Sequence, residues 1–205
     1  MARLSIPWVD KTSAILASIP FAVELYRRWL GGKVSFPRAV LGIQILVLTI
    51  VMVLRKPPVR ITPNPWFWLL AFVTSYGFLA FPALAPPGAA LAPAVVANGL
   101  AVLSVVILVY ALLSLGTSIS FVPSQRDIVT HDAYRLVRHP IYTGAFVALP
   151  AFILRAYSLV NLAIAVTLIV LLMIWSVVEE RFLRGDATYA AYLRQVRWRW
   201  FPGIA

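Results

Sequence analysis

This sequence contains no cysteine, two histidines and seven acidic residues among its 205 residues. Without cysteine there can be no disulfide bond, no thiolate metal ligand and no cysteine nucleophile. The two histidines, His131 and His139, are too few for a histidine-rich metal cluster. Protein classes that depend on any of these groups are therefore excluded.

Charged residues are also scarce. They make up 12% of the chain, whereas 61% of the residues are hydrophobic and the mean hydropathy is +0.88. A soluble domain has roughly 45–50% apolar and about 25% charged residues. A water-soluble core of this size could not hide so much apolar side chain. We therefore expect an all-α fold, a polytopic transmembrane helical bundle.

The few charges that remain are mostly positive, with a formal net charge of +11. In a soluble protein this excess would suggest a nucleic-acid partner. Here the lysines and arginines lie between apolar runs, where they would meet anionic lipid headgroups. We expect the lipid bilayer as partner and no nucleic acid. The sequence carries no signal for an oligomeric state.

Six apolar segments alternate with stretches rich in glycine, proline and charge. A bilayer core about 30 Å thick needs ~20 helical residues to cross. We expect five to six membrane helices, of which the short fifth forms an antiparallel hairpin with the sixth, and we expect Ser158 to cap that sixth helix. In the first segment, Glu24 is expected to pair with Arg27 or Arg28. The segments are residues 12–30, 40–54, 66–84, 94–115, 141–154 and 159–178.

The distribution of lysine and arginine predicts the orientation. The stretch 55–60, the stretch 116–140 and the C-terminal tail are basic, whereas 85–93 carries no charge. Because cytoplasmic loops are enriched in these residues, we expect the three basic regions to face the cytoplasm and the protein to lie in the cell inner membrane. The cations around 27–38 conflict with six crossings, so the first segment would be re-entrant or strongly tilted.

We interpret residues 1–205 as one membrane domain with a short polar tail. Residues 1–115 would supply the N-terminal transmembrane helices, and residues 116–205 the catalytic C-terminal part. The second half holds most of the polar chemistry, above all in "YRLVRHPIYTG", residues 134–144. The positive-inside rule explains the arginines of this stretch, but it does not explain two tyrosines and a His-Pro step that leads into a membrane helix.

Two carboxylates stand where the last apolar segment leaves the membrane. Glu180 has Arg184 one helical turn later, so a surface ion pair accounts for it. Glu179 lies on the apolar face with Trp175, so it should turn towards protein, and such a residue is a functional candidate. An ion pair of Glu179 with Arg135 or Arg138 is the structural alternative.

These features predict a pocket at the cytoplasmic membrane surface. It would be lined by the 116–140 loop and by the facing ends of the fifth and sixth helices. One or two cations, a carboxylate and aromatic faces suit a zwitterionic or amphiphilic ligand. A ligand carboxylate can pair with arginine or histidine, and a positively charged sulfur or nitrogen can lie against a tyrosine or tryptophan face.

The stretch "YRLVRHPIYTG", followed by "EERFL" and "YAAYLRQV", resembles the C-terminal signature of the isoprenylcysteine carboxyl methyltransferase family. The preceding "LGTSISFVP…IVTHDAY" resembles that family's lead-in to the same motif. The members are integral-membrane enzymes that use S-adenosylmethionine, and they are related to phospholipid N-methyltransferases. The resemblance covers roughly residues 115–202.

The resemblance implies an S-adenosylmethionine site, from which S-adenosylhomocysteine would leave as product. His139 or Arg138 would hold the methionine carboxylate, Glu179 its amine, and Tyr142 would pack by the sulfonium or the adenine. Glu179, His139 and Arg138 are therefore the candidate catalytic residues. The cofactor-binding residues implied by the match are Arg126, Asp127, Ile128, Val129, Tyr134, His139, Pro140, Ile141, Tyr142 and Glu179.

The sequence departs from the family pattern at the acceptor side. The family places an arginine one turn before the carboxylate pair, and this chain has Trp175 there. An arginine could bind a substrate carboxylate, whereas Trp175 would favour an apolar or cationic headgroup. We expect methyl transfer to a lipophilic acceptor, either a prenylated small molecule or a lipid. If the acceptor has a proton to lose, Glu179 or His139 would take it.

Three other functions fit parts of the pattern. A phospholipid or amine N-methyltransferase would share the cofactor site and differ in the acceptor. A membrane reductase of the sterol type carries a similar Arg-His-Pro-x-Tyr element and would use NADPH. A channel or transporter would need polar groups within its spans, and the first four apolar segments have almost none.

Overall fold

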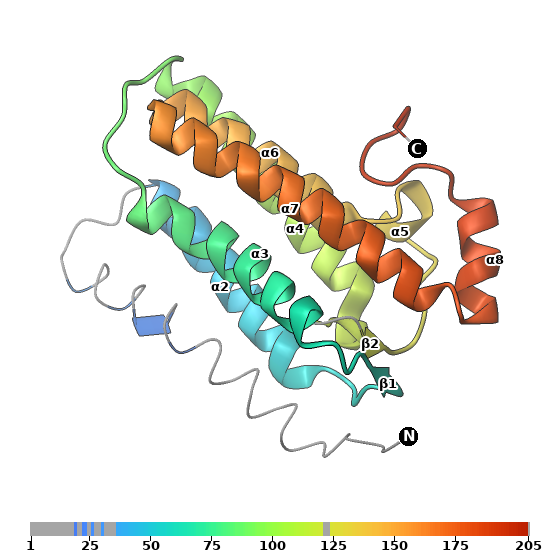
Figure 1. Ribbon diagram of the computed structural model, residues 1–205. Helices are drawn as coiled ribbons and strands as arrows, with labels where there is room; N and C mark the ends of the chain where they lie inside the picture. Colours follow the sequence, from blue (N-terminus) through green and yellow to red (C-terminus); the bar gives the residue numbers. More distant parts are fainter. Residues whose placement is uncertain are drawn as a thin grey trace.

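Helices form almost all of the regular structure in the computed structural model of this protein (Figure 1). The prediction of a mostly helical protein is therefore confirmed. The predicted Glu24 ion pair and the topology of the first segment lie outside the described part of the chain. The structure describes residues 36–120 and 124–204, together with Ile19, Ala22, Val23, Tyr26 and Leu30.

The first two described helices are bounded by prolines. α2 spans Phe36–Leu54 and α3 spans Pro65–Leu84. Pro57 lies shortly after α2, and proline disfavours the continuation of a helix because it lacks the amide hydrogen that the helix needs. Pro65 begins α3, where that hydrogen has no partner in any case. The Asn64 side chain caps α3 by accepting a backbone hydrogen bond at 3.0 Å.

The other three long helices follow the apolar segments of the second half. α4 spans Ala94–Leu115, α6 spans Pro140–Arg155 and α7 spans Leu159–Leu183. Their starts agree with the predicted ones to within a residue. Ser158 caps α7 by accepting a hydrogen bond from a backbone N–H at 3.1 Å, as predicted. The apolar segment ends at residue 178, and the charged residues after it remain helical to Leu183, as the predicted position of Glu179 and Glu180 on this helix requires.

Three of these helices are long and apolar enough to cross a membrane: α3, α4 and α7. Two shorter apolar stretches, Gly42–Leu54 in α2 and Pro140–Arg155 in α6, accompany them. α6 and α7 contact each other and are joined by the turn at residues 156–158. The membrane character of the chain is thus confirmed. The count of five to six spans and the crossing of α6 and α7 as a membrane hairpin stay predictions.

The helices pack as neighbours that are distant in sequence. α4 packs closely on α6, while α2 packs on α4 and α3 packs on α7 (Figure 1). Gly144 of α6 permits the closest approach, because a Cβ there would lie 3.1 Å from Leu108 Cβ and 3.2 Å from Ser104 O. The apolar layer between α2 and α4 includes the buried Met52 and Leu112.

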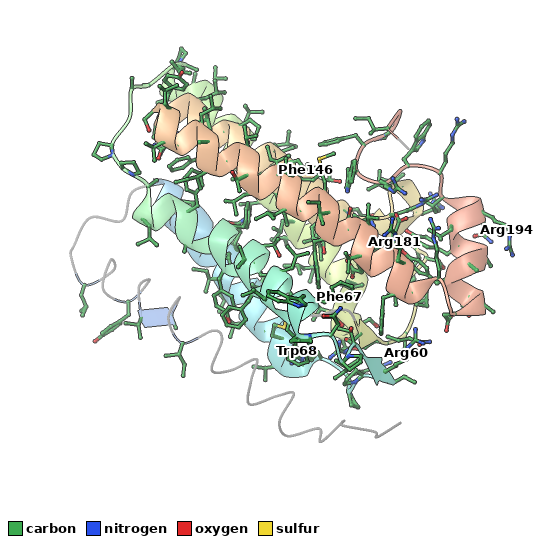
Figure 2. All side chains as sticks on the ribbon, viewed as in Figure 1. Arg60, Phe67, Trp68, Phe146, Arg181 and Arg194 are labelled. Carbon is green, nitrogen blue, oxygen red and sulfur yellow. The ribbon has the colours of Figure 1, made fainter. Side chains whose placement is uncertain are left out.

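Short polar elements gather at one end of the bundle. β1, Arg60–Ile61, pairs antiparallel with β2, Ser124–Gln125. The 3-10 helix η1, Gly116–Ser118, and α5, Ala133–Leu136, lie in the same loop region, and α8, Ala187–Gln195, follows α7. The three basic regions of the sequence therefore meet at this end. Figure 2 shows Arg60, Arg181 and Arg194 there.

The uncharged loop lies at the opposite end of the bundle. Residues 85–93 follow α3 and contact the turn between α6 and α7, where Ala89 and Tyr157 form an isolated antiparallel bridge. The buried Asn161 amide reinforces this contact by donating to Pro86 O at 3.0 Å and to Ala156 O at 2.7 Å. The structure thus separates the basic end from an end whose 85–93 loop is uncharged and where Arg155 ends α6.

Candidate functional site

A cavity of about 200 Å³ lies beside the loop region at the basic end and extends between the helices. Apart from Pro140, all of the predicted site residues line it. Pro140 is buried as the first residue of α6, where it starts the helix. The predicted residues that line the cavity are Arg126, Asp127, Ile128, Val129, Tyr134, Arg138, His139, Ile141, Tyr142, Trp175 and Glu179.

His139 lies between the two carboxylates of α7. Its Nδ1 atom is 3.9 Å from Glu179 Oε2, and its Nε2 atom is 3.3 Å from Glu180 Oε1. The imidazole is 6% exposed and stacks on the Tyr142 ring with the centroids 5.3 Å apart. Because Pro140 starts α6 immediately after it, His139 is held at the junction of an extended segment and a helix.

Glu179 faces the cavity and remains partly accessible. Its side chain is 28% exposed, and it accepts a hydrogen bond from the Tyr142 hydroxyl at 2.9 Å. Trp175, one helical turn earlier on α7, is buried and also lines the cavity. The predicted orientation of Glu179 towards protein agrees with this placement. The structural alternative was an ion pair between Glu179 and an arginine; in the structure Arg138 pairs instead with Glu180, the next residue along the helix.

The expectation that Glu180 is a surface residue is wrong. The predicted pair with Arg184 exists, at 3.8 Å, but Glu180 is only 1% exposed. Arg138 Nη1 lies 3.5 Å from its Oε1 atom, and Arg199 Nε donates to the same oxygen at 3.2 Å. Two of these partners are distant in sequence, so helical spacing alone could not identify the burial.

The C-terminal tail folds back onto the site. The predicted short polar tail contains the whole of α8 and a segment that returns to His139. Arg138 N donates to Trp198 O and His139 N to Arg199 O, each at 2.9 Å. Trp200 Nε1 also donates to Ser176 Oγ at 3.3 Å. These contacts fix the backbone of the Arg-His-Pro segment.

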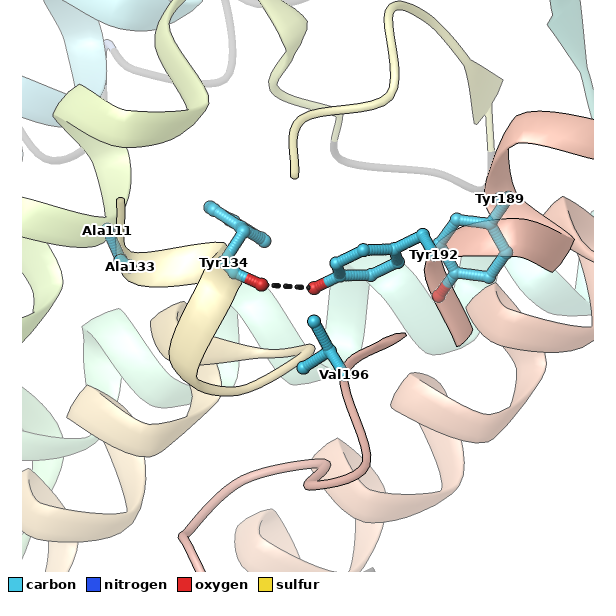
Figure 3. Packing of buried hydrophobic residues seen from close by; sticks show 6 residues of the cluster. All are labelled: Ala111, Ala133, Tyr134, Tyr189, Tyr192 and Val196. Carbon is cyan, nitrogen blue, oxygen red and sulfur yellow. Dashed lines mark hydrogen bonds between the residues drawn. The ribbon is translucent and has the colours of Figure 1, made fainter. Parts of the chain in front are cut away.

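Three tyrosines form the wall between α5 and α8 (Figure 3). The Tyr192 hydroxyl donates to Tyr134 O at 2.7 Å. Burial raises the pKa of the Tyr134, Tyr189 and Tyr192 hydroxyls above the usual value for tyrosine. Tyr189 and Tyr192 line the cavity, and sequence reasoning missed both. The signals were the stretch "YAAYLRQV" quoted above and the spacing of the two tyrosines, which places them on one face of a helix that Asp186 caps.

Arg126 connects the cavity wall to the loop after α2. It is 6% exposed; its Nε donates to Lys56 O at 2.7 Å and its Nη1 to Ser124 Oγ at 2.5 Å. Asp127, beside it, pairs with Lys56 Nζ at 2.5 Å, and both side chains are exposed. The guanidinium therefore joins two regions that are far apart in the sequence.

Part of the remaining lining comes from α2 and α3, which the sequence analysis did not assign to the site. Most of these side chains are apolar, and three are polar but uncharged. No motif marked them, because they lie within long apolar runs and carry no charge. They are Gln44, Leu48 and Met52 of α2, and Thr74, Ser75, Phe78 and Leu79 of α3.

Comparison with known proteins gives one family. Residues 88–189 match the model of the family described as phospholipid methyltransferase. The match begins in the loop before α4 and ends within α8, so it contains His139 and Glu179. α2, α3 and the returning tail lie outside it. No curated protein matches the chain.

Proposed function

Through residues 88–189 this chain belongs to the phospholipid methyltransferase family, and on that premise we propose that it is an integral-membrane, S-adenosylmethionine-dependent methyltransferase with a lipophilic acceptor. The family includes membrane enzymes similar to isoprenylcysteine carboxyl methyltransferases, so the resemblance in the sequence is confirmed. The methyl donor and the acceptor belong to the proposal.

The observation that carries the proposal is the convergence of the predicted residues on one cavity. Their chemistry fits S-adenosylmethionine, which supplies a methyl group on a positively charged sulfur. Glu179 would hold the amine, and the imidazole of His139 would face the carboxylate. The Tyr142 ring, stacked on His139, would lie against the sulfonium or the adenine.

Arg138 acts in this proposal as a positioning residue. Its guanidinium lies 3.5 Å from Glu180 and donates to Val196 O at 2.7 Å and to Leu193 O at 3.2 Å. These contacts occupy Arg138 with the protein itself. It would therefore hold the segment before His139 in place, while His139 and Glu179 would touch the cofactor.

The reaction would be a direct transfer. Held by Glu179 and His139, S-adenosylmethionine would supply an electrophilic methyl group to the acceptor atom, and the electron pair of the sulfur–methyl bond would remain on sulfur. The protein would contribute mainly by holding the reacting atoms roughly 3–3.5 Å apart. A neutral acceptor would also lose a proton, and Glu179 or His139 would accept it.

The whole chain would form one membrane domain, with several passes and with α6 and α7 crossing as a hairpin. The basic end would face the cytoplasm of a cell inner membrane. In support of this orientation, the three basic regions meet at one end, and the 85–93 loop at the other end carries no charge.

Calorimetric binding of S-adenosylhomocysteine in detergent tests the cofactor site. His139→Ala and Glu179→Ala should each abolish measurable binding while the protein stays folded. His131→Ala is the matched control, because His131 is exposed and does not line the cavity. Unchanged affinity in both site variants would sink the assignment. Tight NADPH binding without S-adenosylhomocysteine binding would favour the membrane reductase instead.

A phospholipid N-methyltransferase is the second candidate, because the matching family is described by that activity. It would use the same cofactor site with an amine headgroup as acceptor. Lipid extracts from cells with and without the protein distinguish the two acceptors. New mono- or dimethylated headgroups that depend on Glu179 would establish the phospholipid activity.

A further inference from the structure

The cavity has two arms of different character. All of its Arg, Asp, His and Glu lining residues come from residues 126–179, the part of the chain that matches the family. The lining residues of α2 and α3 carry no charge and lie outside that match. We call the side chains from α2 and α3 the neutral arm; they are Gln44, Leu48, Met52, Thr74, Ser75, Phe78 and Leu79.

The polar groups of the neutral arm lie deep along the helices. At 1.5 Å per residue, Gln44 is about 15 Å from the end of α2 at Leu54, and Thr74 is about 14 Å from the start of α3 at Pro65. Both of these helix ends lie at the basic end of the bundle. In a hydrocarbon core about 30 Å thick, these side chains would be near the middle of the bilayer, where water is scarce.

Gln44 is 8% exposed as a residue, and it lines the cavity. Among the residues that the structure describes, no hydrogen bond satisfies its side-chain amide. Thr74, also buried, donates its hydroxyl to Leu70 O at 2.8 Å, which leaves its oxygen lone pairs as acceptors. An amide without a partner in an apolar environment is costly. Polar side chains kept at such depth commonly serve a ligand.

We propose that the neutral arm binds an uncharged amphiphile with a single hydroxyl or carbonyl oxygen, and that the Gln44 amide binds this oxygen. The amide can donate and accept, so it suits either group. Ser75 and Thr74 on α3 complete the polar set, and the apolar remainder of the ligand lies towards Phe78 and Leu79. This inference rests on the proposed function, because the same cavity would hold the methyl donor; the oxygen at Gln44 would serve recognition and would not be the atom that accepts the methyl group.

Charge complementarity excludes an ionic ligand from this arm. Asp127 is paired with Lys56, Arg138 contacts Glu180 and Arg126 donates to Lys56 O. Glu179 and His139 also line the cavity, but the cofactor would occupy them. The arm itself offers no ion of opposite sign, so a carboxylate, a phosphate or an ammonium group would lose its hydration without compensation. Trp175, where the family pattern has arginine, adds a further neutral surface between the two arms.

The test uses ligands of equal chain length, added to the full-length protein in detergent micelles. The probes are 1-tetradecanol, tetradecane, tetradecanoate and tetradecyltrimethylammonium, and apparent affinities come from the shift in thermal unfolding temperature. We expect 1-tetradecanol to bind roughly 3- to 10-fold more tightly than tetradecane, as one neutral hydrogen bond provides. We also expect it to bind more tightly than either charged probe.

Gln44→Met keeps the length of the side chain and removes the amide, so the preference for 1-tetradecanol should disappear. Leu48→Met, on the same helix and the same cavity wall, is the matched control and should keep it. A preference that survives Gln44→Met, or a charged probe that binds best to the native protein, overturns the inference. If Gln44→Met does not fold, Ser75→Ala should reduce the same preference, and an unchanged preference overturns the inference equally.

S-adenosylhomocysteine affinity, measured in the same samples, separates this inference from the proposed function. Gln44→Met should leave the S-adenosylhomocysteine affinity unchanged, because Gln44 carries no charge and lies on α2, whereas His139 and Glu179, which would bind the cofactor, lie at the start of α6 and near the end of α7. If the native protein prefers 1-tetradecanol but does not bind S-adenosylhomocysteine, the neutral subsite is supported and the methyl-transfer function is contradicted. If the native protein binds S-adenosylhomocysteine but does not prefer 1-tetradecanol, the methyl-transfer function is supported and the neutral subsite is contradicted.

Discussion

Neighbouring side chains on one helix have different surroundings at the end of α7. Glu179 faces the cavity and pairs with Tyr142, whereas Glu180 is buried among cations. Successive residues of an α-helix point about 100° apart, so two adjacent carboxylates cannot share one environment. His139 joins the two environments, with one ring nitrogen towards each carboxylate.

Replacing Glu180 with alanine should destabilise the protein severely. The change leaves Arg138 and Arg199 without their shared carboxylate, and breaking a buried ion pair costs about 3–5 kcal/mol. Arg184→Ala is the control, because that side chain is exposed and such pairs contribute about 0–1 kcal/mol. Unfolding in detergent by denaturant measures both. Similar small losses in the two variants would contradict the buried network.

The buried tyrosines predict a loss of stability at high pH. Burial raises the pKa of Tyr189 and Tyr192 in the folded protein, whereas in the unfolded chain tyrosine titrates near its usual value of about 10. Above that pH the unfolded chain binds fewer protons, so folding becomes less favourable, by at most about 1.4 kcal/mol per pH unit for each group. Below it, the contribution is fully present.

Denaturant unfolding between pH 8 and pH 11 tests this dependence. The free energy of unfolding should begin to fall near pH 10. Tyr189→Phe removes one titrating hydroxyl and leaves the hydrogen bond that Tyr192 donates to Tyr134 O intact. It should therefore make the fall in the free energy of unfolding with pH less steep. A slope that is the same in both proteins would refute the assignment to the tyrosines of this wall.

At the scale of elements, local sequence features set most helix bounds. The predicted 94–115 coincides with α4, and 141–154 is within a residue of α6 at each end. α8 escaped prediction because it is short and polar, and hydropathy detects only long apolar runs. Its start nevertheless has a local cause: the Asp186 carboxylate accepts from Thr188 N at 2.8 Å and from Tyr189 N at 3.1 Å.

The contact between the 85–93 loop and the turn after α6 should tolerate no added side chain. A Cβ on Gly88 would lie 2.5 Å from Ala156 C and 2.5 Å from Tyr157 O, both backbone atoms that cannot move aside alone. Gly88→Ala should therefore cost about 1–3 kcal/mol. The free energy of unfolding measures it.

Gly99→Ala is the matched control for this prediction. A Cβ on Gly99 meets nothing within 4 Å, and the residue lies inside α4. Alanine is the better helix former, by about 1 kcal/mol, so this variant should be neutral or more stable. A Gly88→Ala variant as stable as Gly99→Ala would show that the loop is not held against the turn.

At the scale of the whole molecule, the separation of the basic end from the end with the uncharged 85–93 loop predicts the orientation. Because the chain has no cysteine, single-cysteine variants report on it directly. Ala90→Cys lies in the uncharged loop and Arg194→Cys on α8, and both positions are exposed. In spheroplasts, a membrane-impermeant maleimide should label Ala90→Cys at once, and Arg194→Cys only after permeabilisation.

The native chain is the control for that experiment and should take up no label. The reverse pattern would place the proposed active site on the opposite side of the membrane. Labelling of both variants in intact spheroplasts would contradict the separation of the two ends across the bilayer.

By itself, the sequence determined the membrane class, the positions of five helices and the candidate residues around His139 and Glu179. Those properties depend on apolar run length, on proline and on motif spacing, which are local. Only the tertiary structure decided that Glu180 is buried, that the tail returns to the Arg-His-Pro segment, and that α2 and α3 complete the cavity. These outcomes depend on which distant segment packs against each helix face, and no spacing within one segment encodes that choice.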